Sequence, residues 1–360
     1  MSLVRATPFH ARTAATNRLN RWQAREGWTL AASYSDPHAE ALAARLSCAV
    51  ADISWRWHVM VEGPRAEEFL SRLVTRDPSK LSPGAAFKAL WLNDAGGLRG
   101  AGVIARHGKQ TFALIAAASD MDWIARAASL FDVCVRHIAD GGLAIIGPYA
   151  RKVIAASGLD ATLEPLCFRK IFWRGLDVTL SRFGEQGGYE LWCKDDDATI
   201  VWDRIVKAGE AFALKPAGLD AMDILDLEAG VPRPGRDYEP ARDGFSPSPS
   251  PYEFGLESLI DSDHAIFNGR KAFLLSSKTK TRVGIEFDVE TPAPHAPLTR
   301  EGRIVGHTLS SLYSPALRRA IALAVVENAV AGPGTELAAN GGTARVCASP
   351  FLPLPDSILE

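Results

Sequence analysis

One local pattern occurs twice in the sequence and limits the folds open to it. Residues 59–73, VMVEGPRAEEFLSRL, have the alternation of a strand, then a Gly-Pro turn, then the apolar spacing of a helix, and residues 143–157, LAIIGPYARKVIAAS, repeat that order. Proline suits the first helical turn, where its missing N–H removes no hydrogen bond. Two such units, with Gly63 and Gly147 separated by 84 residues, predict a duplicated α+β module. Two unrelated helix starts are the alternative.

Length and composition set the scale of the protein. A chain of 360 residues exceeds what one hydrophobic core usually supports, so two or three domains are expected. Hydrophobic residues make up 47% of the chain and charged residues 23%, as in an ordinary globular protein. The formal net charge is -2 and no basic block occurs, which argues against nucleic acid or an anionic membrane as a partner.

Targeting and redox features point to the cytoplasm. Arginines fall within residues 1–25, where a signal peptide would need an apolar run, and no apolar stretch approaches the roughly 18 residues of a spanning helix. The five cysteines are scattered without a C-x-x-C pair. Reduced thiols fit that pattern better than disulfides or a zinc site, so a cytoplasmic protein without membrane contact is expected.

Other stretches indicate the remaining elements. Residues 87–106 have a hairpin pattern, residues 121–130 that of a helix, and residues 219–229 the period of a further helix. Residues 231–251 contain six prolines, which predicts a loop across a domain boundary. From Thr281 onward, short strand-like pieces separated by Gly and Pro predict an all-β domain.

The stretch RFGEQGGYELWC, residues 182–193, threads aromatic residues and carboxylates through three glycines. Tyr189–Cys193 has a strand pattern, and Gly184–Gly188 is expected to form the turn before it. Glycine lets a ligand approach the backbone closely. A ring supplies a stacking face and a carboxylate accepts two parallel hydrogen bonds, so the stretch suits a flat heterocycle with adjacent N–H donors, such as a pterin or guanine edge. An ordinary hairpin with a surface glutamate is the alternative.

Other kinds of chemistry have little support. The histidines lack metal-type spacing, so no metal site is expected, and neither a G-x-S-x-G nucleophile motif nor a phosphate-binding G-x-x-x-x-G-K motif occurs. Residues 54–61, SWRWHVMV, place Trp55 and Trp57 on one face of an expected strand. That face could line an aromatic pocket or belong to a core.

Seven segments, in their order along the chain, resemble the folate-dependent aminomethyltransferase family, whose type member is the T-protein of the glycine cleavage system. They are ADIS (51–54), EGPRAEEFLSRLVTRDPSKL (62–81), LNDAGG (92–97), GEQGGYEL (184–191), GLDAMDILDLEAGVPRPG (218–235), FNGRKAF (267–273) and VGHTLSSLYSPALRRAIALAVV (305–326). Each segment alone is a weak signal, whereas seven in the same order are specific. Together they cover nearly the whole chain.

The resemblance implies an α+β fold of three domains arranged as a cloverleaf, with tetrahydrofolate in a central hole and an antiparallel β-barrel at the C-terminus. The expected folate-binding α+β domain is discontinuous and consists of residues 1–50 and 140–255. Residues 51–139 are expected to form a second α+β domain, and residues 256–360 a linker helix and the barrel. Each α+β domain then contains one of the two strand–Gly-Pro–helix units.

The resemblance also assigns cofactor-binding residues. By position, Glu190 matches the glutamate with which the family binds the pterin, and Tyr189 lies beside it. Phe183 and Lys88 are expected to contact the same cofactor, tetrahydrofolate. Lys88 stands where the family has a tyrosine, five residues before the Asn of the turn. The carboxylate that the chemistry of the stretch requires and the family's glutamate are therefore the same residue.

Other positions depart from the family pattern. The two aspartates of its turn, the second of which is catalytic, fall on Gly100 and Ala101, which can neither move a proton nor hold a carboxylate's charge. Two family arginines fall on Met222 and Asp226, so cationic contacts are missing there. These departures argue against glycine cleavage and favour the related tetrahydrofolate-dependent demethylases.

The expected function is therefore that of a tetrahydrofolate-dependent methyltransferase or demethylase. It would move a methyl group from a small donor (a sulfonium, N-methyl or aryl methoxy compound) to N5 of the folate, a transfer in which alignment of the reactants supplies much of the rate. The alternatives are a glycine cleavage aminomethyltransferase and a non-catalytic folate-binding protein like the iron–sulfur maintenance relatives, whose motif cysteine has no counterpart here. The donor and the oligomeric state stay open.

A phenolate leaving group would need a proton donor or a nearby cation. Candidates for that role are Tyr313 in an expected SSLYSP loop, Arg99 in the altered turn, and Lys88. Trp55, Trp57 and Trp91 are candidate walls of the donor pocket, through cation–π contact with a methylated cation or stacking on an aryl ether. Barrel packing for Tyr313, a solvated surface for Arg99 and core packing for the tryptophans are the alternatives.

Overall fold

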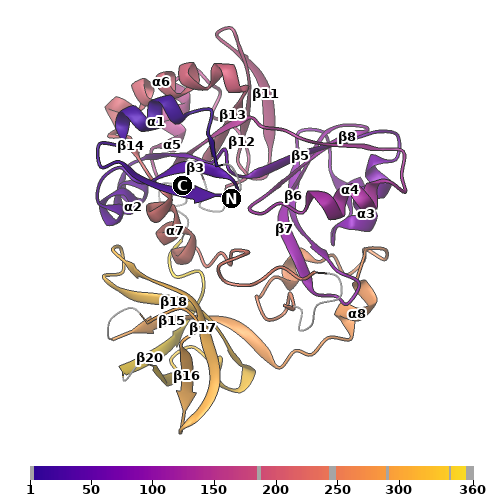
Figure 1. Ribbon diagram of the computed structural model, residues 1–360, viewed down its shortest axis with the longest axis vertical. Helices are drawn as coiled ribbons and strands as arrows, with labels where there is room; N and C mark the ends of the chain where they lie inside the picture. Colours follow the sequence, from indigo (N-terminus) through magenta and orange to yellow (C-terminus); the bar gives the residue numbers. More distant parts are fainter. Residues whose placement is uncertain (1–3, 185–187, 243–248, 289–291, 340–341, 354–360) are drawn as a thin grey trace.

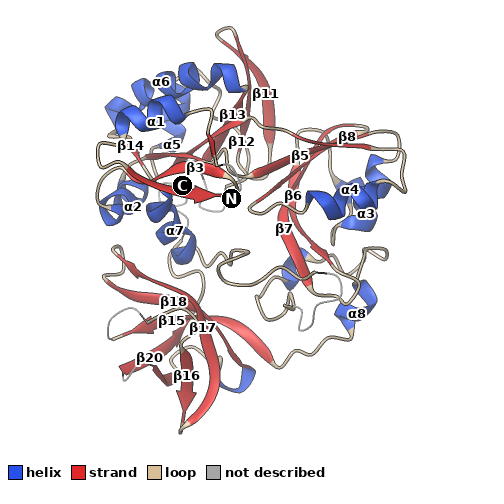
Figure 2. Ribbon diagram, in the orientation of Figure 1, coloured by secondary structure: helices blue, strands red, loops and turns tan. Residues whose placement is uncertain are grey.

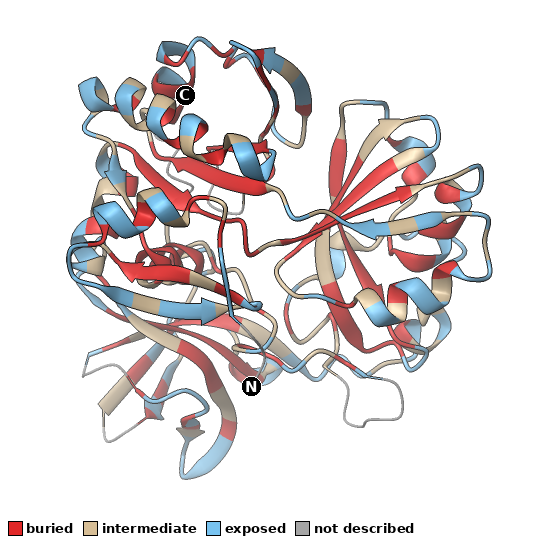
Figure 3. Ribbon diagram, turned by 45° about the horizontal axis from the view of Figure 1, so that its top comes forward, coloured by how far each residue is buried: buried red, intermediate tan, exposed pale blue. Residues whose placement is uncertain are grey.

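The protein is described by a computed structural model that covers residues 4–184, 188–242, 249–288, 292–339 and 342–353. The chain forms three lobes that surround a common centre (Figure 1). Two lobes combine helices with sheets, and the third is built from strands (Figure 2). Buried residues follow the strands of each lobe, whereas the outward faces of the helices are exposed (Figure 3).

The first lobe is built on a six-stranded sheet with the order β11-β12-β13-β10-β4-β14. Its strands are β4 (Ala49–Asp52), β10 (Gly141–Ile146), β11 (Phe168–Trp173), β12 (Leu176–Ser181), β13 (Tyr189–Cys193) and β14 (Lys215–Pro216), and its helices are α5 (Ala150–Ala156), η2 (Asp195–Asp197), α6 (Ala198–Gly209) and η3 (Glu210–Phe212). Val153 of α5 and Ile205 of α6 are buried against one face of the sheet. Ala144 and Trp192 on its other face belong to a core shared with the second lobe.

A smaller sheet, with the order β1-β3-β2, completes the first lobe. Its elements are β1 (Arg5–Ala6), β2 (Arg21–Arg25) and β3 (Trp28–Ser33), joined by α1 (His10–Thr16), α2 (Pro37–Leu46) and α7 (Leu219–Glu228). Helix α7 is buried on nearly every side. It contacts α2 and β3 of this lobe as well as β17 (Arg303–Ser314) and β18 (Arg319–Glu327) of the third lobe, which explains its burial all round.

The second lobe is a five-stranded sheet with the order β6-β7-β8-β5-β9 and two helices. Its elements are β5 (Trp57–Glu62), α3 (Ala66–Leu73), η1 (Pro78–Lys80), β6 (Ala86–Leu92), β7 (Leu98–Gly108), β8 (Thr111–Ala116), α4 (Met121–Ala128) and β9 (Cys134–His137). Phe69 of α3 and Ile124 of α4 pack in its core. Strands β6 and β7 pair antiparallel, which confirms the hairpin predicted at residues 87–106.

Both strand–Gly-Pro–helix units are present, because β5 leads to α3 and β10 leads to α5. Gly63 and Gly147 have φ angles of 142° and 118°. A Cβ added at Gly63 would lie 2.5 Å from the carbonyl oxygen of Asp132, and one at Gly147 would lie 2.6 Å from that of Ala44. Glycine is required at both turns because another chain segment passes too close for a side chain.

The two prolines do not begin the helices as the sequence pattern suggested. The residues that cap the N-termini of α3 and α5 are Arg65 and Tyr149, so Pro64 and Pro148 each stand one residue before the cap. The fixed φ of proline therefore shapes the turn that leaves the strand, not the first turn of the helix.

The third lobe is a closed barrel with the strand order β15-β18-β17-β16-β19-β20, and all its pairs are antiparallel. Its remaining elements are β15 (Lys280–Phe287), β16 (Pro297–Arg300), η5 (Asn328–Val330), β19 (Glu336–Ala339) and β20 (Gly342–Cys347). Ile285, Leu298 and Val326 are buried inside it. The predicted α+β fold with a C-terminal antiparallel barrel is confirmed.

The chain between α7 and β15 runs along the second lobe before it reaches the barrel (Figure 1). It contains η4 (Glu257–Leu259) and α8 (Arg270–Leu274). The backbone N–H of Asp261 donates to Thr75 O at 3.0 Å, and Nδ2 of Asn268 donates to Leu92 O at 2.9 Å. This connecting segment therefore ties the second lobe to the rest of the molecule. The domain boundaries given by the sequence stay a prediction.

Candidate functional site

A cavity of about 300 Å³ lies where the three lobes meet. Its walls come from the first lobe (residues 52–53 and 55–56, Phe183 and α7), from β6, β7 and β8 of the second lobe, and from the connecting segment and Arg282 of β15. Sites for small molecules and cofactors usually measure about 300–1,000 Å³ and combine an apolar lining with a few polar groups. This central cavity is therefore the candidate functional site.

A tight turn between β4 and β5 carries the chain from the first lobe to the second and forms one wall of the central cavity. Oδ1 of Asp52 accepts hydrogen bonds from the backbone N–H and the hydroxyl of Ser54, at 3.0 and 2.6 Å, and its Oδ2 accepts one from the Thr7 hydroxyl at 2.6 Å. Burial raises the pKa of Asp52, although these hydrogen bonds act in the opposite direction. The turn places Trp55 and Arg56 on the wall.

Glu190 of β13 lies behind Arg56 and not on the cavity wall itself. Nη1 of Arg56 is 2.5 Å from Oε1 of Glu190, and the two side chains are 14% and 1% exposed. The indole N–H of Trp192 donates to Oε2 of Glu190 at 3.4 Å. The carboxylate that the sequence assigns to a pterin is therefore next to the central cavity, with its charge balanced by a guanidinium.

Tyr189 and Glu190 point to opposite faces of the sheet because side chains alternate along a strand. The hydroxyl of Tyr189 donates to Ala161 O at 2.6 Å, and its ring packs in the core of the first lobe. Tyr189 is not among the residues that line the central cavity, which corrects the expectation that it shares a pocket with Glu190. Phe183 does line the cavity.

The turn expected at Gly184–Gly188 falls mostly outside the described residues. Gly188 is described, and its φ is 76°. A Cβ added there would clash with the carbonyl oxygen of Ile145 on β10. Glycine is therefore required directly before Tyr189 by the close approach of the neighbouring strand.

The wall formed by β7 has no carboxylate at the two positions matched to family aspartates. Ala101 lines the central cavity, and Gly100 lies against the indole ring of Trp91. A Cβ added at Gly100 would overlap Cε2 and Cζ2 of that ring. Nε1 of Trp91 donates to Oδ2 of Asp120 at 3.2 Å, which holds the ring in this position. Shape as well as charge therefore excludes an acidic side chain at residue 100.

Arg99 is buried in an ion pair and is not free to serve the central cavity. Its Nε and Nη2 donate to the two carboxylate oxygens of Asp120 at 2.8 and 2.7 Å. Its guanidinium carbon lies 4.4 Å from the ring centroid of Trp123. The side chain lines a separate space of about 20 Å³ on the far side of Gly100. Arg99 was expected to be a catalytic residue, with a solvated surface position as the alternative. The structure corrects both expectations, because Arg99 has a structural role in a buried ion pair.

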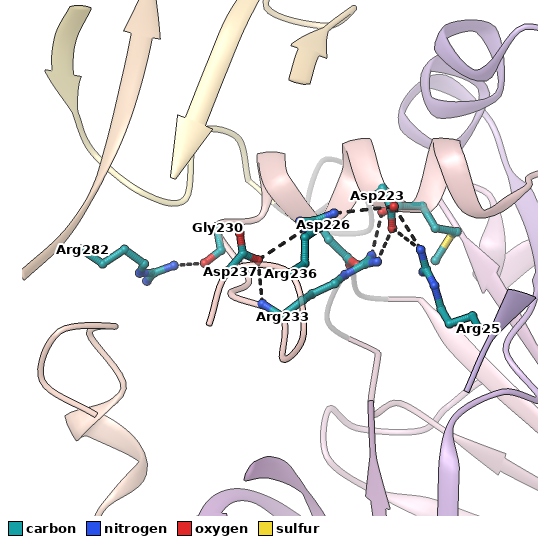
Figure 4. A network of polar contacts seen from close by, with 9 residues as sticks. Arg25, Asp223, Asp226, Gly230, Arg233, Arg236, Asp237 and Arg282 are labelled. Carbon is teal, nitrogen blue, oxygen red and sulfur yellow. Dashed lines mark hydrogen bonds and ion pairs between the residues drawn. The ribbon is translucent and has the colours of Figure 1, made fainter. Parts of the chain in front are cut away.

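Asp226 of α7 and Arg233 of the loop after it line the central cavity and belong to a network of charged residues (Figure 4). Asp226, which stands in place of a family arginine, forms an ion pair with Arg233. Asp223, one turn earlier, pairs with Arg233 and also with Arg25 of β2, whose Nη2 is 3.0 Å away. Burial lowers the pKa of Arg233 to about 9, with Asp223 opposing the shift. The guanidinium of Arg233 therefore lies beside Asp226, the position at which the family has an arginine.

Two further guanidinium groups extend this network. Nε of Arg236 lies 3.5 Å from Asp237, whose carboxylate also accepts a hydrogen bond from the backbone N–H of Arg233 at 2.7 Å. Arg282 of β15 donates to the carbonyl oxygen of Gly230 and lines the cavity (Figure 4). Burial lowers the pKa of Arg282. The barrel lobe contributes to the site through this one strand.

The three tryptophans predicted to form a donor pocket are separated by the fold. Trp55 lines the central cavity, and the guanidinium carbon of Arg25 lies 5.1 Å from its ring centroid. Trp57 and Trp91 are buried in the core of the second lobe. The expected aromatic box is therefore corrected to a single tryptophan, accompanied in the cavity wall by Phe183.

The remaining predicted residues divide between the cavity and the surface. Lys88 of β6 and Met222 of α7 line the cavity. Tyr313 lies in β17 instead of a loop, is 42% exposed, and its ring centroid is 5.5 Å from that of His38 on α2. Since Tyr313 is not among the cavity residues, the structure gives no support to its role as a proton donor and the prediction is corrected.

Several cavity residues were not recognised as site residues in the sequence. Arg56 lies within the tryptophan-rich SWRW stretch (54–57) and Asp52 lies two residues before it, and the two tryptophans are the more conspicuous side chains there. Arg233 and Arg282 come from two different lobes and carry no motif that links them. The signal for Arg233 was present, since an arginine follows closely on a helix whose family arginines are replaced by Met222 and Asp226.

Two structural observations concern metal sites and membrane-spanning helices. Within the described ranges, no three His, Cys, Asp or Glu side chains gather so as to hold a metal ion. No helix among the described residues is long and apolar enough to span a membrane. The central cavity is lined by both charged and apolar side chains.

Comparisons with known proteins agree with this architecture. Residues 11–264 match the family described as "GCVT N-terminal domain", and residues 280–352 match "Glycine cleavage T-protein C-terminal barrel domain". The chain is 31% identical to an aminomethyltransferase of Frankia alni, over 91% of this chain and 92% of the relative, and 32% identical to one of Thermotoga neapolitana, over 84% and 85%. The crystal structure of glycine cleavage system aminomethyltransferase T from Bartonella henselae superposes with a TM-score of 0.88 at 25% identity, covering 98% of this chain and 99% of that one.

Proposed function

Because the chain belongs to the family of the glycine cleavage T-protein, a family of tetrahydrofolate-dependent transferases, we propose that it transfers a methyl group from a small methylated molecule to tetrahydrofolate. The methyl donor would be a sulfonium, an N-methyl or an aryl methoxy compound. The observation that carries the proposal is the β7 wall, where Ala101 faces the cavity and Trp91 covers Gly100.

The residues of the central cavity fit a reduced folate. The cavity has a volume of about 300 Å³, and the ring of Phe183 forms part of its wall. The Glu190 carboxylate lies behind that wall, in contact with the side chain of Arg56. When bound, tetrahydrofolate supplies N5 as the atom that accepts the methyl group. The cations Lys88, Arg233 and Arg282 line the same cavity and favour an anionic ligand such as a folate.

The apolar β7 wall favours methyl donors whose leaving group departs without taking up a proton. As the new N–C bond forms, the bond between methyl carbon and heteroatom breaks, the leaving group keeps the electron pair, and the N5 proton passes to water. A sulfonium or quaternary ammonium group departs neutral and needs no acid, whereas a phenolate requires a donor or a cation. Ala101 supplies neither, and Lys88 is the cavity cation that could serve a phenolate. Alignment by the walls supplies the remaining catalysis.

A second candidate function is aminomethyl transfer, and the named relatives favour it. Proteins called aminomethyltransferases share 31–32% identity with this chain over most of its length. If the chain performs that reaction, a carboxylate other than residue 101 must serve the reacting nitrogen. Among the described residues, Asp52 is the carboxyl group of the cavity wall that is not in an ion pair, and burial raises its pKa.

One assay separates the two functions. The purified protein is incubated anaerobically with tetrahydrofolate and, in separate reactions, a dimethylsulfonium compound, a quaternary N-methyl compound or an aryl methyl ether. Formation of 5-methyltetrahydrofolate, measured by mass spectrometry, supports methyl transfer. A parallel reaction contains the aminomethyl-lipoyl carrier protein, and release of ammonia with 5,10-methylenetetrahydrofolate there, but no 5-methyltetrahydrofolate in the first set, would replace the proposal by the second candidate.

A further inference from the structure

We infer that Arg56 limits the affinity of the site, because it occupies the ligand's place on Glu190 and must leave it before a pterin can bind there. The inference rests on the proposed function, which places a reduced folate in the central cavity. It adds a competition between Arg56 and the pterin for the Glu190 carboxylate, which would not arise from Glu190 alone.

The relative depth of the two side chains is the first support. Arg56 lines the cavity, whereas Glu190 does not and is only 1% exposed. Nη1 of Arg56 is 2.5 Å from Oε1 of Glu190, so the residue that contacts the carboxylate is itself one that lines the cavity. A ligand in the cavity therefore meets Arg56 before it meets Glu190.

The chemistry of the two competitors is the second support. An arginine side chain ends in a planar guanidinium whose N–H groups bind a carboxylate in parallel pairs. The N3–H and 2-amino group of a reduced pterin form a cyclic guanidine edge with the same donor arrangement. Oε1 of Glu190 is taken by Arg56, and Oε2 has a long hydrogen bond from Trp192 at 3.4 Å. A pterin edge that binds both carboxylate oxygens in parallel needs Oε1, and Arg56 occupies that oxygen.

The surroundings of Glu190 indicate that the site is built for more than Arg56. Ser181 lies directly opposite Glu190 on the neighbouring strand β12, so its side chain is on the same face of the sheet. Ser181 is fully buried, and its hydroxyl has no hydrogen-bond partner among the residues that the structure describes. A buried hydroxyl without a partner is unfavourable, and a polar ligand edge on Glu190 could supply one.

The backbone of Arg56 is fixed while its side chain can turn away. The backbone N–H of Arg56 donates to Ile53 O at 3.0 Å, within the turn held by Asp52. The guanidinium stands at the end of a long flexible side chain whose residue lines the cavity, so rotation of the side chain can take it off Glu190 without moving the turn. If the paired state dominates, the apparent affinity for a pterin falls by the fraction of molecules in which Glu190 is available.

The test is an affinity measurement on Arg56→Met with a matched control. The probe is 5-formyltetrahydrofolate, a chemically stable reduced folate, and the method is isothermal titration calorimetry. Arg45 and Glu228 form another buried ion pair, with 2.7 Å between Nε and Oε2 and exposures of 7% and 1%, and neither residue lines the cavity. Arg45→Met therefore reports what the loss of a buried arginine does to the fold alone.

We expect Arg56→Met to bind the probe at least about tenfold more tightly than the wild type, and Arg45→Met to bind it as the wild type does. The double variant Arg56→Met/Glu190→Gln should lose that gain, because the gain depends on the freed carboxylate. Thermal melting and circular dichroism establish that each variant is folded, and tightened binding by Arg56→Met cannot arise from unfolding.

Other results overturn the inference in distinguishable ways. If the wild type binds the probe and folded Arg56→Met binds it equally or more weakly, Arg56 is not a competitor and the inference fails while the proposed function stands. The same holds if the gain persists in the double variant. If neither the wild type nor Arg56→Met binds any reduced folate, the proposed function fails together with the inference.

Discussion

The indole ring of Trp91 occupies the space that a side chain on Gly100 would need. The two residues face each other across the β6–β7 hairpin, where their Cα atoms are paired. Residue 100, which matches a family aspartate, therefore has no room for a side chain while this ring is in place. The site cannot be returned to the family pattern by one substitution.

The first prediction concerns this contact. Gly100→Ala should lower the free energy of unfolding by about 1–3 kcal/mol, because its Cβ overlaps a buried ring held by Asp120. Adding Trp91→Leu should make the two changes less than additive, since the obstructing ring is gone. Denaturant unfolding measures both. The control is Gly108→Ala in the same strand, where a Cβ meets nothing closer than 4.0 Å. Equal effects at 100 and 108 would contradict the prediction.

The second prediction concerns pH. Burial, helped by the neighbouring cations Arg136 and Lys170, lowers the pKa of His58 to about 3, while an unfolded histidine titrates near 6.5. Between these values the unfolded chain binds the extra proton, so the stabilisation is complete above pH 6.5 and is lost as pH falls toward 3. At pH 5 the loss amounts to about 2 kcal/mol.

The control for this pH effect is His58→Phe, which removes the titrating group but keeps an aromatic ring. Unfolding free energies measured at pH 8 and pH 5 should differ less in that variant than in the wild type. The same substitution at the exposed His38 should leave the difference as it is in the wild type. A pH dependence unchanged by His58→Phe would assign the effect to other groups.

The third prediction concerns the charged network at the end of α7. Arg233→Met should destabilise the protein by about 3–5 kcal/mol, because Asp226 and Asp223 would be left as buried carboxylates without their shared cation. Arg303→Met breaks an exposed ion pair with Glu327 and should leave the unfolding midpoint nearly unchanged. Similar midpoints for the two variants would show that Arg233 is not needed to balance that charge.

The fourth prediction separates two tryptophans that the sequence treats alike. Trp55→Leu should raise KM for the methyl donor several-fold, because Trp55 lines the cavity. Trp57→Leu should lower the melting temperature and leave KM unchanged, because Trp57 lies in the core of the second lobe. Steady-state kinetics and thermal melting together give the comparison. A rise in KM for Trp57→Leu at constant stability would place that residue in the site after all.

Parts of this protein were predictable because they depend on neighbours along the chain. Strand β13 spans Tyr189–Cys193 as its alternating pattern indicated, and the hairpin of β6 and β7 follows from the Asn-Asp-Ala-Gly-Gly turn. The all-β character of the third lobe follows from short strands separated by glycine and proline, whereas its closure into a barrel was expected only from the family resemblance. The position of the prolines was misjudged because a Gly-Pro turn and a helix start look alike in sequence, and only the backbone angles distinguish them.

The functional assignment of individual side chains was less predictable. Trp91 and Arg99 both satisfy the expected chemistry, yet Asp120 from a separate helix start engages both and turns them into parts of the core. Tyr313 was placed in a loop near the site, whereas its strand leads it to the surface beside His38. Such outcomes depend on which partner lies opposite a side chain, and sequence spacing does not encode that.

The amino-acid sequence by itself determined the kinds of elements, their order and the family, since periodicity, turn residues and collinear motifs are local properties of the chain. Only the tertiary structure decided which side chains meet in the centre. Arg56 and Glu190 are 134 positions apart, and Arg282 approaches Gly230 from another lobe. Contacts of this kind arise because packing three lobes around one cavity buries charges that must then find partners, and that requirement appears only after the lobes have assembled.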